Sequence, residues 1–151
     1  MASISGGALV TGAATRLGRS IALALASEGH DVAIHYASSQ AQALSCAEEA
    51  RALGVKAVTL QADLLDREAV AGLVPRALEA LGGPLGVLVN NASIFENDSF
   101  DANDEALWDM HFDVQTQNAE RNESKASDLT VEHINKCVHP GPFDWTQSFA
   151  F

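Results

Sequence analysis

The chain has 151 residues, of which 47% are hydrophobic and 19% charged, a composition typical of one globular domain and not of a disordered chain. Nine basic residues against 20 acidic ones give a net charge of −11, which opposes binding to a phosphate backbone and argues against a nucleic-acid partner. No apolar run is long enough to span a membrane, no basic secretory signal starts the chain, and Cys46 and Cys137 cannot form a disulfide framework, so we expect a cytoplasmic protein with no membrane partner.

Short apolar runs alternate with helical patterns along the first two thirds of the chain. Strands are predicted over residues 8–11, 31–36, 56–61 and 85–90. Helices are predicted over residues 17–27, 40–53, 67–81 and, as the start of a further helix, 104–112. Ser39 and Asp66 are suitable N-caps, and Pro75 is expected to kink or shorten the third helix.

This alternation of strands and helices predicts an α/β fold. Apolar strands joined through helices favour a parallel sheet covered on both faces. Right-handed crossovers then give the first half of a Rossmann-like doubly wound sheet, with strand order 3-2-1-4. A ligand of such a sheet binds beyond the carboxyl ends of the strands, between strands 1 and 4.

The composition changes after residue 114. Residues 1–114 contain 23 alanines, whereas residues 115–151 contain three and are mostly polar. We therefore predict one Rossmann-like domain over 1–114 and an atypical, irregular tail over 115–151 that could be flexible. Residues 129–134 could form a strand that covers strand 4. His133, Cys137 and His139 have the types of metal ligands, but three residues without a fourth favour incidental residues over a metal site.

The turn after the first predicted strand contains Gly12 and Gly18 and leads into a predicted helix. Gly12 permits a tight turn, and Gly18 lets the helix pack closely on the sheet. Backbone N–H groups of this turn and the positive end of the helix dipole can hold a diphosphate. A glycine turn without a ligand is the alternative, but the position between a strand and a helix favours dinucleotide binding.

Three motifs together carry a resemblance to a known family. Thr11-Gly-x-x-x-x-x-Gly18, Asp63 after the third strand and Asn90-Asn91-Ala92 after the fourth resemble the short-chain dehydrogenase/reductase family over residues 4–114. Arg16 stands where the usual turn has its middle glycine. The turn and the segment from Asn90 to Phe95 are similar to the pteridine reductase branch. The tail 115–151 does not match the family.

The resemblance implies a role for each matching residue. Asp63 would accept hydrogen bonds from the adenine edge with Leu64 beside it, and Asn91 and Ala92 would line the adenosine ribose. Ser93 would face cofactor and substrate, and Phe95 would stack on a flat pterin. An ordinary buried aromatic that anchors a loop is the alternative for Phe95.

The end of the second predicted strand favours NADP over NAD. NAD-selective sites place a carboxylate there, and this chain has none. Arg16, His35, Ser38 and Ser39 could instead receive a 2′-phosphate. The predicted cofactor-binding residues are Gly12, Thr15, Arg16, Leu17, Gly18, His35, Tyr36, Ser38, Ser39, Asp63, Leu64, Asn91, Ala92 and Ser93. The predicted substrate-binding residues are Ser93 and Phe95.

The family's acid–base residues have no counterpart in this chain. Its single tyrosine, Tyr36, belongs to a strand, and neither Lys125 nor Lys136 follows a tyrosine by four positions. Gln115 stands where the family asparagine would fall. We therefore predict no catalytic residue and keep three hypotheses: an NADPH-dependent reductase of a carbonyl or pterin-like small molecule, a dinucleotide binder without turnover, and an inert fragment. A homo-oligomer is compatible with the sequence, which does not fix the oligomeric state.

Overall fold

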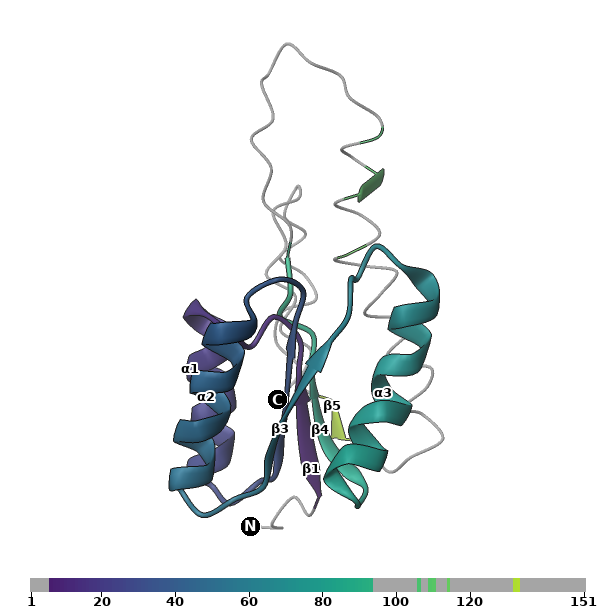
Figure 1. Cartoon of the computed structure of the whole chain (residues 1–151). Helices are drawn as coiled ribbons and strands as arrows, with labels where there is room; N and C mark the ends of the chain where they lie inside the picture. Colours follow the sequence, from purple (N-terminus) through teal and green to yellow (C-terminus); the bar gives the residue numbers. More distant parts are fainter. Residues whose placement is uncertain (1–5, 94–105, 107–108, 111–113, 115–131, 134–151) are drawn as a thin grey trace, which may run out of the picture.

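Parallel strands with helices on both faces form the fold (Figure 1). The computed structural model describes residues 6–93, 106, 109–110, 114 and 132–133. The strands are β1 (Gly7–Val10), β2 (Val32–Tyr36), β3 (Ala57–Gln61), β4 (Leu85–Val89) and β5 (Glu132–His133). The helices are α1 (Arg16–Ser27), α2 (Gln40–Ala52) and α3 (Arg67–Leu81). The bounds of β1 to β4 and of α1 to α3 lie within one residue of the predicted ones, whereas β5 is shorter than the predicted 129–134.

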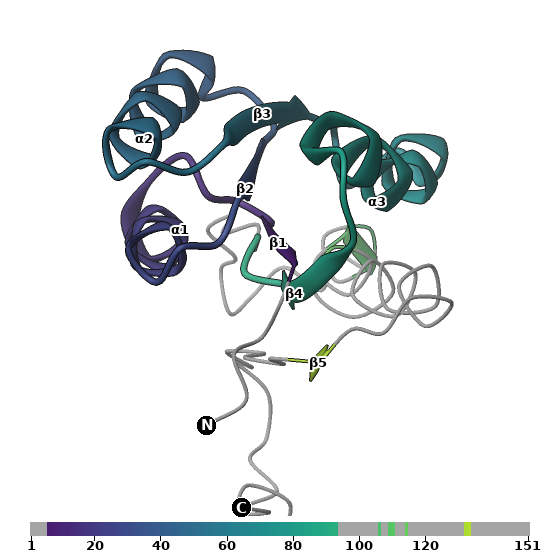
Figure 2. The ribbon, with the colours of Figure 1, turned by 90° about the horizontal axis from the view of Figure 1, so that it is seen from below.

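The sheet has the order β3-β2-β1-β4-β5, and every neighbouring pair is parallel. The predicted Rossmann-like order 3-2-1-4 is therefore confirmed. Figure 2 shows α1 and α2 on one face of the sheet and α3 on the other. This arrangement is the one that right-handed crossovers on the two sides of β1 produce.

The two faces of the sheet are built from side chains of different size. The buried residues of α1 and α2 are mostly alanine, such as Ala22, Ala26 and Ala47, so these helices lie close to the strands. The buried side chains of α3 are mostly larger, such as those of Leu73 and Val74. Successive strand residues alternate between these two cores because side chains of a strand point to opposite faces.

The ends of the helices only partly follow the predicted caps. The carboxylate of Asp66 accepts hydrogen bonds from the N–H groups of Glu68 and Ala69, which confirms it as the N-cap of α3. Ser39 occupies the N-cap position of α2, but its side chain makes no capping hydrogen bond. The helix α3 contains Pro75 and continues to Leu81, so the proline does not shorten it.

Residues from the predicted tail contribute to the sheet. β5 pairs with β4, with Glu132 opposite Val87 and His133 opposite Leu88. The expectation that this segment covers strand 4 is confirmed for these two residues. From the predicted fourth helix, Ala106, Asp109 and Met110 are helical. Val114, which follows it, is buried in the core on the α3 face.

Candidate dinucleotide site

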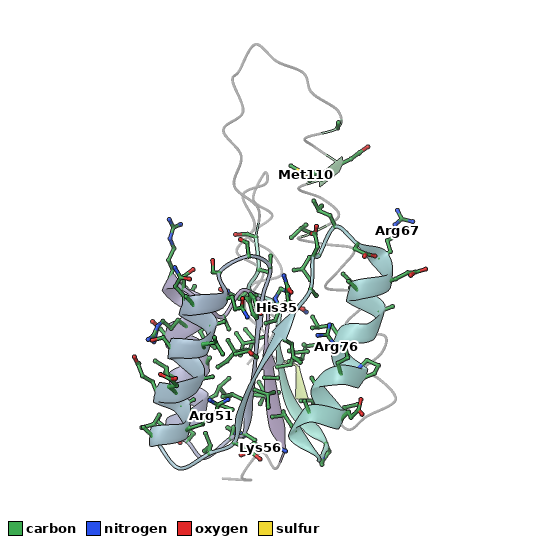
Figure 3. The ribbon with its side chains drawn as sticks, viewed as in Figure 1. His35, Arg51, Lys56, Arg67, Arg76 and Met110 are labelled. Carbon is green, nitrogen blue, oxygen red and sulfur yellow. The ribbon has the colours of Figure 1, made fainter. Side chains whose placement is uncertain are left out.

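The predicted site residues follow the carboxyl ends of β1, β2, β3 and β4. Because these strands are parallel, the four connections that follow them lie along one edge of the sheet. Figure 3 shows His35 toward this edge, while Arg51 and Lys56 lie toward the opposite one. The fold thus brings together residues that are up to 81 positions apart in the chain.

The side chain of Thr11 joins the end of β1 to the end of β4. Its hydroxyl donates to the carbonyl of Val89 at 3.3 Å and accepts from the N–H groups of Asn91 at 2.9 Å and Ala92 at 3.0 Å. A hydroxyl can donate one hydrogen bond and accept two, so this one is fully used. Thr11 is therefore a buried anchor that fixes the two connections relative to each other.

The start of α1 packs directly on this anchor. The Asn91 side-chain amide donates to the carbonyls of Thr11 at 3.0 Å and Gly12 at 3.3 Å. A Cβ on Gly18 would lie 2.2 Å from the Gly12 carbonyl oxygen and 2.5 Å from the Asn91 amide nitrogen. A Cβ on Gly12, whose φ is 63°, would lie 2.9 Å from the Cα of Ala92. Only glycine fits at either position.

The backbone N–H groups of the turn divide into two sets. Those of Thr11, Gly12 and Ala13 donate to Val89, to the His35 ring and to the His35 carbonyl. Those of residues 14–18 have no hydrogen-bond acceptor within the described part of the chain. The expected anion site is therefore narrower than Gly12 to Gly18, because the Gly12 amide is already used.

The free N–H groups lie at the N-terminus of α1, which is where an anion is held most favourably. No acidic residue occurs in the first turn of α1, and the N-cap Thr15 makes no side-chain capping bond. Thr15, Arg16 and Leu17 are exposed, and Leu17 has 54% of its surface accessible. The residues present therefore fit a diphosphate at this helix end.

Arg16 combines a charge with an unusual backbone. Its φ is 50°, which makes it the non-glycine residue with positive φ in the described part of the chain. An L-residue in this left-handed conformation carries a cost of about 1–2 kcal/mol. Strain of this kind concentrates at functional sites. The guanidinium is exposed and makes no hydrogen bond to another described residue, so it is free for a ligand.

His35 has a different place from the one we expected. The side chain is 1% exposed, and both ring nitrogens are engaged, with the Gly12 N–H at 3.0 Å and the Ala62 carbonyl at 3.1 Å. Burial lowers the pKa of His35 from its ordinary value of 6.5; the hydrogen bond to Ala62 opposes this lowering, and the positive charge of Arg76 adds to it. The expected direct contact of His35 with a 2′-phosphate is therefore corrected. The buried, neutral ring instead holds the glycine turn through its hydrogen bond with the Gly12 N–H.

The residues after His35 differ in their exposure. Tyr36 is buried against the α1 and α2 face. Ser38 is exposed and Ser39 half-buried, and no described carboxylate follows β2 before α2 begins. Two hydroxyls thus stand at the end of β2 where an NAD-selective site has a carboxylate.

Asp63 and Leu64 follow β3 and point to different surroundings. Asp63 is exposed, and one of its carboxylate oxygens accepts from the Leu65 N–H at 2.9 Å. The second oxygen accepts from no other residue that the structure describes, so it could receive a donor such as an adenine amino group. The Leu64 side chain is buried in the core on the α3 face.

The last described residues of the site follow β4. Asn91 and Ala92 are half-buried, and Ser93 is exposed. Phe95, the predicted stacking residue, lies outside the described residues, as do Cys137 and His139. Among the residues that the structure does describe, no group of three or more His, Cys, Asp or Glu could hold a metal ion. None of the described helices is long and apolar enough to cross a membrane.

A glycine turn between β1 and α1, anchored on an Asn-Asn-Ala segment after β4, is what the resemblance led us to expect. A sequence model of the short-chain dehydrogenases matches residues 7–120, which is more than half of the chain. The chain belongs to the short-chain dehydrogenase family.

Individual members of the family are similar to this chain over its first part. The 3-oxoacyl-acyl-carrier-protein reductase FabG of Staphylococcus aureus is 41% identical over 107 residues, which cover 71% of this chain and 43% of that protein. The structure of FolM alternative dihydrofolate reductase 1 from Brucella canis, complexed with NADP, has 38% identity and a TM-score of 0.77, and the match covers 84% of this chain and 50% of that one.

A further solved member, a short-chain dehydrogenase from Burkholderia cenocepacia in complex with NADP, has 37% identity and a TM-score of 0.78. The match covers 82% of this chain and 50% of that structure. The chain thus spans about half or less of the relatives that it matches.

Two functional features of the site were missed by sequence reasoning. The sequence analysis used Thr11 only as the first residue of the glycine motif, and this motif does not predict the three hydrogen bonds of its hydroxyl. The link from the His35 ring to Gly12 was also missed. One signal was available: a histidine inside a buried apolar strand needs partners for its ring nitrogens.

Proposed function

We propose that residues 1–114 of this chain bind NADP(H) and form the cofactor half of an NADPH-dependent reductase. The observation that carries the proposal is the row of N–H groups over residues 14–18, at the N-terminus of α1, that have no acceptor among the described residues. A diphosphate would accept hydrogen bonds from these groups and interact favourably with the helix dipole. Solved relatives from Brucella and Burkholderia that share this fold were crystallized with NADP, which supports the proposal.

The choice of NADP over NAD rests on charge at the end of β2. The exposed guanidinium of Arg16 and the hydroxyls of Ser38 and Ser39 provide donors for a 2′-phosphate. No described carboxylate occupies the end of β2 to bind an unmodified ribose. We therefore expect tighter binding of NADPH than of NADH.

The substrate is proposed to be a carbonyl compound or a pterin-like molecule. When bound, NADPH would supply a hydride to a C=O or C=N bond. Ser93, exposed after β4, would face the substrate, and Phe95 would stack on a flat ring. The name of the Brucella relative, a dihydrofolate reductase, supports the pterin option, and that of FabG supports the carbonyl option.

A second function, dinucleotide binding without turnover, is favoured by the position of the only tyrosine. Family members use a tyrosine, assisted by a lysine four residues later, as general acid. Tyr36 is buried within β2 and faces the core, so its hydroxyl cannot protonate a substrate beyond the strand ends. The chain itself therefore supplies cofactor contacts and no proton donor of this kind.

Two measurements separate the functions. Calorimetry with NADPH and with NADH tests binding, and a thermal shift supports it, since a ligand at about 100 times its dissociation constant adds about 2.7 kcal/mol of stability. NADPH consumption with pterin, quinone and ketone substrates tests turnover. Binding with consumption indicates a reductase, and binding without consumption indicates a dinucleotide binder. Absence of heat with either nucleotide would contradict both functions.

A further inference from the structure

The His35 ring forms a bridge between two connections of the site. His35 is the next-to-last residue of β2. Its Nδ1 atom accepts from the Gly12 N–H at 3.0 Å, and its Nε2 atom lies 3.1 Å from the Ala62 carbonyl oxygen. Gly12 begins the turn that leads to the free N–H groups, and Ala62 precedes Asp63. One ring therefore touches both the diphosphate side and the adenine side of the proposed NADP(H) site.

The hydrogen-bond partners determine the tautomer of the ring. The Gly12 N–H can only donate, so Nδ1 is the acceptor and carries no proton. The Ala62 carbonyl can only accept, so Nε2 carries the proton. A second proton on Nδ1 would place two N–H groups face to face and break the bond to Gly12. The bridge exists only while the imidazole is neutral.

The surroundings of the ring oppose a positive charge. His35 shares its face of β2 with Ala33, which belongs to the core against α3. The charged group of α3 that acts on the ring is Arg76, whose guanidinium donates to the Gln61 carbonyl at 2.8 Å (Figure 3). The partners on the β1 and β3 sides, Gly12 and Ala62, are uncharged. Asp63 follows Ala62 in the sequence, and its carboxylate accepts a hydrogen bond from the Leu65 N–H.

We propose that His35 is a positioning residue for the dinucleotide site, which fixes the Gly12 turn relative to the Ala62–Asp63 connection and releases the turn when it gains a proton. The proposal rests on the proposed binding of NADP(H). It adds that affinity depends on the protonation of a residue that does not touch the cofactor. Only Ala13 separates Gly12 from the N–H groups of residues 14–18, so a displaced Gly12 would move these groups as well.

Two substitutions separate the two ends of the bridge. The amide of His35→Asn lies where Nδ1 was and can still accept from Gly12, whereas that of His35→Gln lies where Nε2 was and can still donate to Ala62. NADPH dissociation constants are measured by calorimetry for the full chain and both variants, from about pH 8 to about pH 5, a range that includes the ordinary histidine pKa.

We expect the NADPH affinity of the unmodified chain to fall by about tenfold or more once the pH drops below the pKa of His35, which burial sets below its ordinary value of 6.5, because the neutral ring is then lost. His35→Asn should keep its affinity within about threefold at neutral pH and lack this additional acid loss. His35→Gln should bind about tenfold more weakly at every pH. The 2′-phosphate also titrates, near pH 6, but it does so equally for all three proteins.

A cofactor-free measurement makes the result independent of binding. The amide resonance of Gly12 is followed by NMR in the unmodified chain while the His35 ring is titrated. We expect the Gly12 amide to shift with the same midpoint as the ring. If neither nucleotide binds but the Gly12 amide still follows the ring, the proposed function fails while the bridge itself stands.

The opposite results would overturn the role of His35. One is a Gly12 amide that does not respond when the ring is protonated. Another is NADPH binding with the same affinity and pH profile in His35→Asn and His35→Gln while both lose thermal stability, which would reduce the residue to a structural role.

Discussion

Arg16 carries a charge on a backbone conformation that glycine prefers. Replacing it with glycine removes the left-handed strain, so Arg16→Gly should raise the free energy of unfolding by about 1 kcal/mol in denaturant titrations. The same change should weaken NADPH binding about tenfold or more, because a charge-assisted hydrogen bond is worth about 1.5–3 kcal/mol. NADH binding should change little.

Arg16→Ala and Arg67→Ala are the controls for this prediction. Arg16→Ala keeps the positive φ without relieving it, so it should lose NADPH affinity and gain no stability. Arg67, an exposed arginine at the start of α3, carries the same charge, and its loss should leave the preference for NADPH unchanged. An equal loss of NADPH and NADH affinity in Arg16→Ala would remove the role in 2′-phosphate binding.

Substitutions at Thr11 measure how much its hydroxyl contributes to the stability of the site. Thr11→Val keeps the shape but leaves the N–H groups of Asn91 and Ala92 without their acceptor. We expect a loss of about 2–3 kcal/mol in the free energy of unfolding, measured by denaturant titration. Thr11→Ser keeps the hydroxyl and should lose less than half as much; an equal loss in both variants would show that the methyl group is what matters.

The charge state of His35 also affects folding. Its pKa is lowered in the folded chain, so the unfolded chain binds more protons in the interval between the two pKa values. The contribution of His35 to stability is therefore fully present above about pH 6.5 and is lost as the pH falls toward the lowered value. Urea titrations across this interval should show a weaker acid dependence for His35→Asn than for the unmodified chain.

At the scale of elements, the sequence predicted most of what the structure contains. Apolar runs and helix periodicity located β1 to β4 and α1 to α3, because both patterns, and a cap such as Asp66, depend on residues that are close together in the sequence. Contacts between segments far apart in the chain could not be predicted. The left-handed Arg16, the amide of Gly12 taken by His35 and the unused cap of Ser39 each depend on atoms that the fold brings together.

The N-terminus of α3 gives a prediction at this scale. The Asp66 carboxylate accepts from Glu68 and Ala69, so Asp66→Ala should cost about 1 kcal/mol of stability in thermal or denaturant unfolding. Asp66→Asn retains an acceptor and should lose clearly less. No loss in Asp66→Ala would mean that water replaces the cap at no cost.

At the scale of the whole molecule, β5 covers the edge of β4. Replacing Glu132 and His133 together by proline removes the N–H groups that this short strand brings to the sheet. We expect a loss of about 1 kcal/mol and self-association that grows with protein concentration in light scattering, because an uncovered strand pairs with other chains. The double alanine variant retains the N–H groups and should match the unmodified chain in stability and in light scattering. Unchanged scattering in the proline variant would exclude a role of β5 in preventing self-association.

The hydroxyl of Thr11 and the amide of Asn91 meet across 80 positions of sequence. During synthesis on the ribosome, the glycine turn therefore emerges long before the segment that locks it. While Asn91 and Ala92 are still inside the exit tunnel, the turn lacks their hydrogen bonds to Thr11, so we expect the proposed NADP(H) to add no stability to the nascent chain. For a slow-folding variant, we accordingly expect NADPH to increase the yield of folded chain only after β4 and the Asn91–Ala92 segment that follows it have left the exit tunnel.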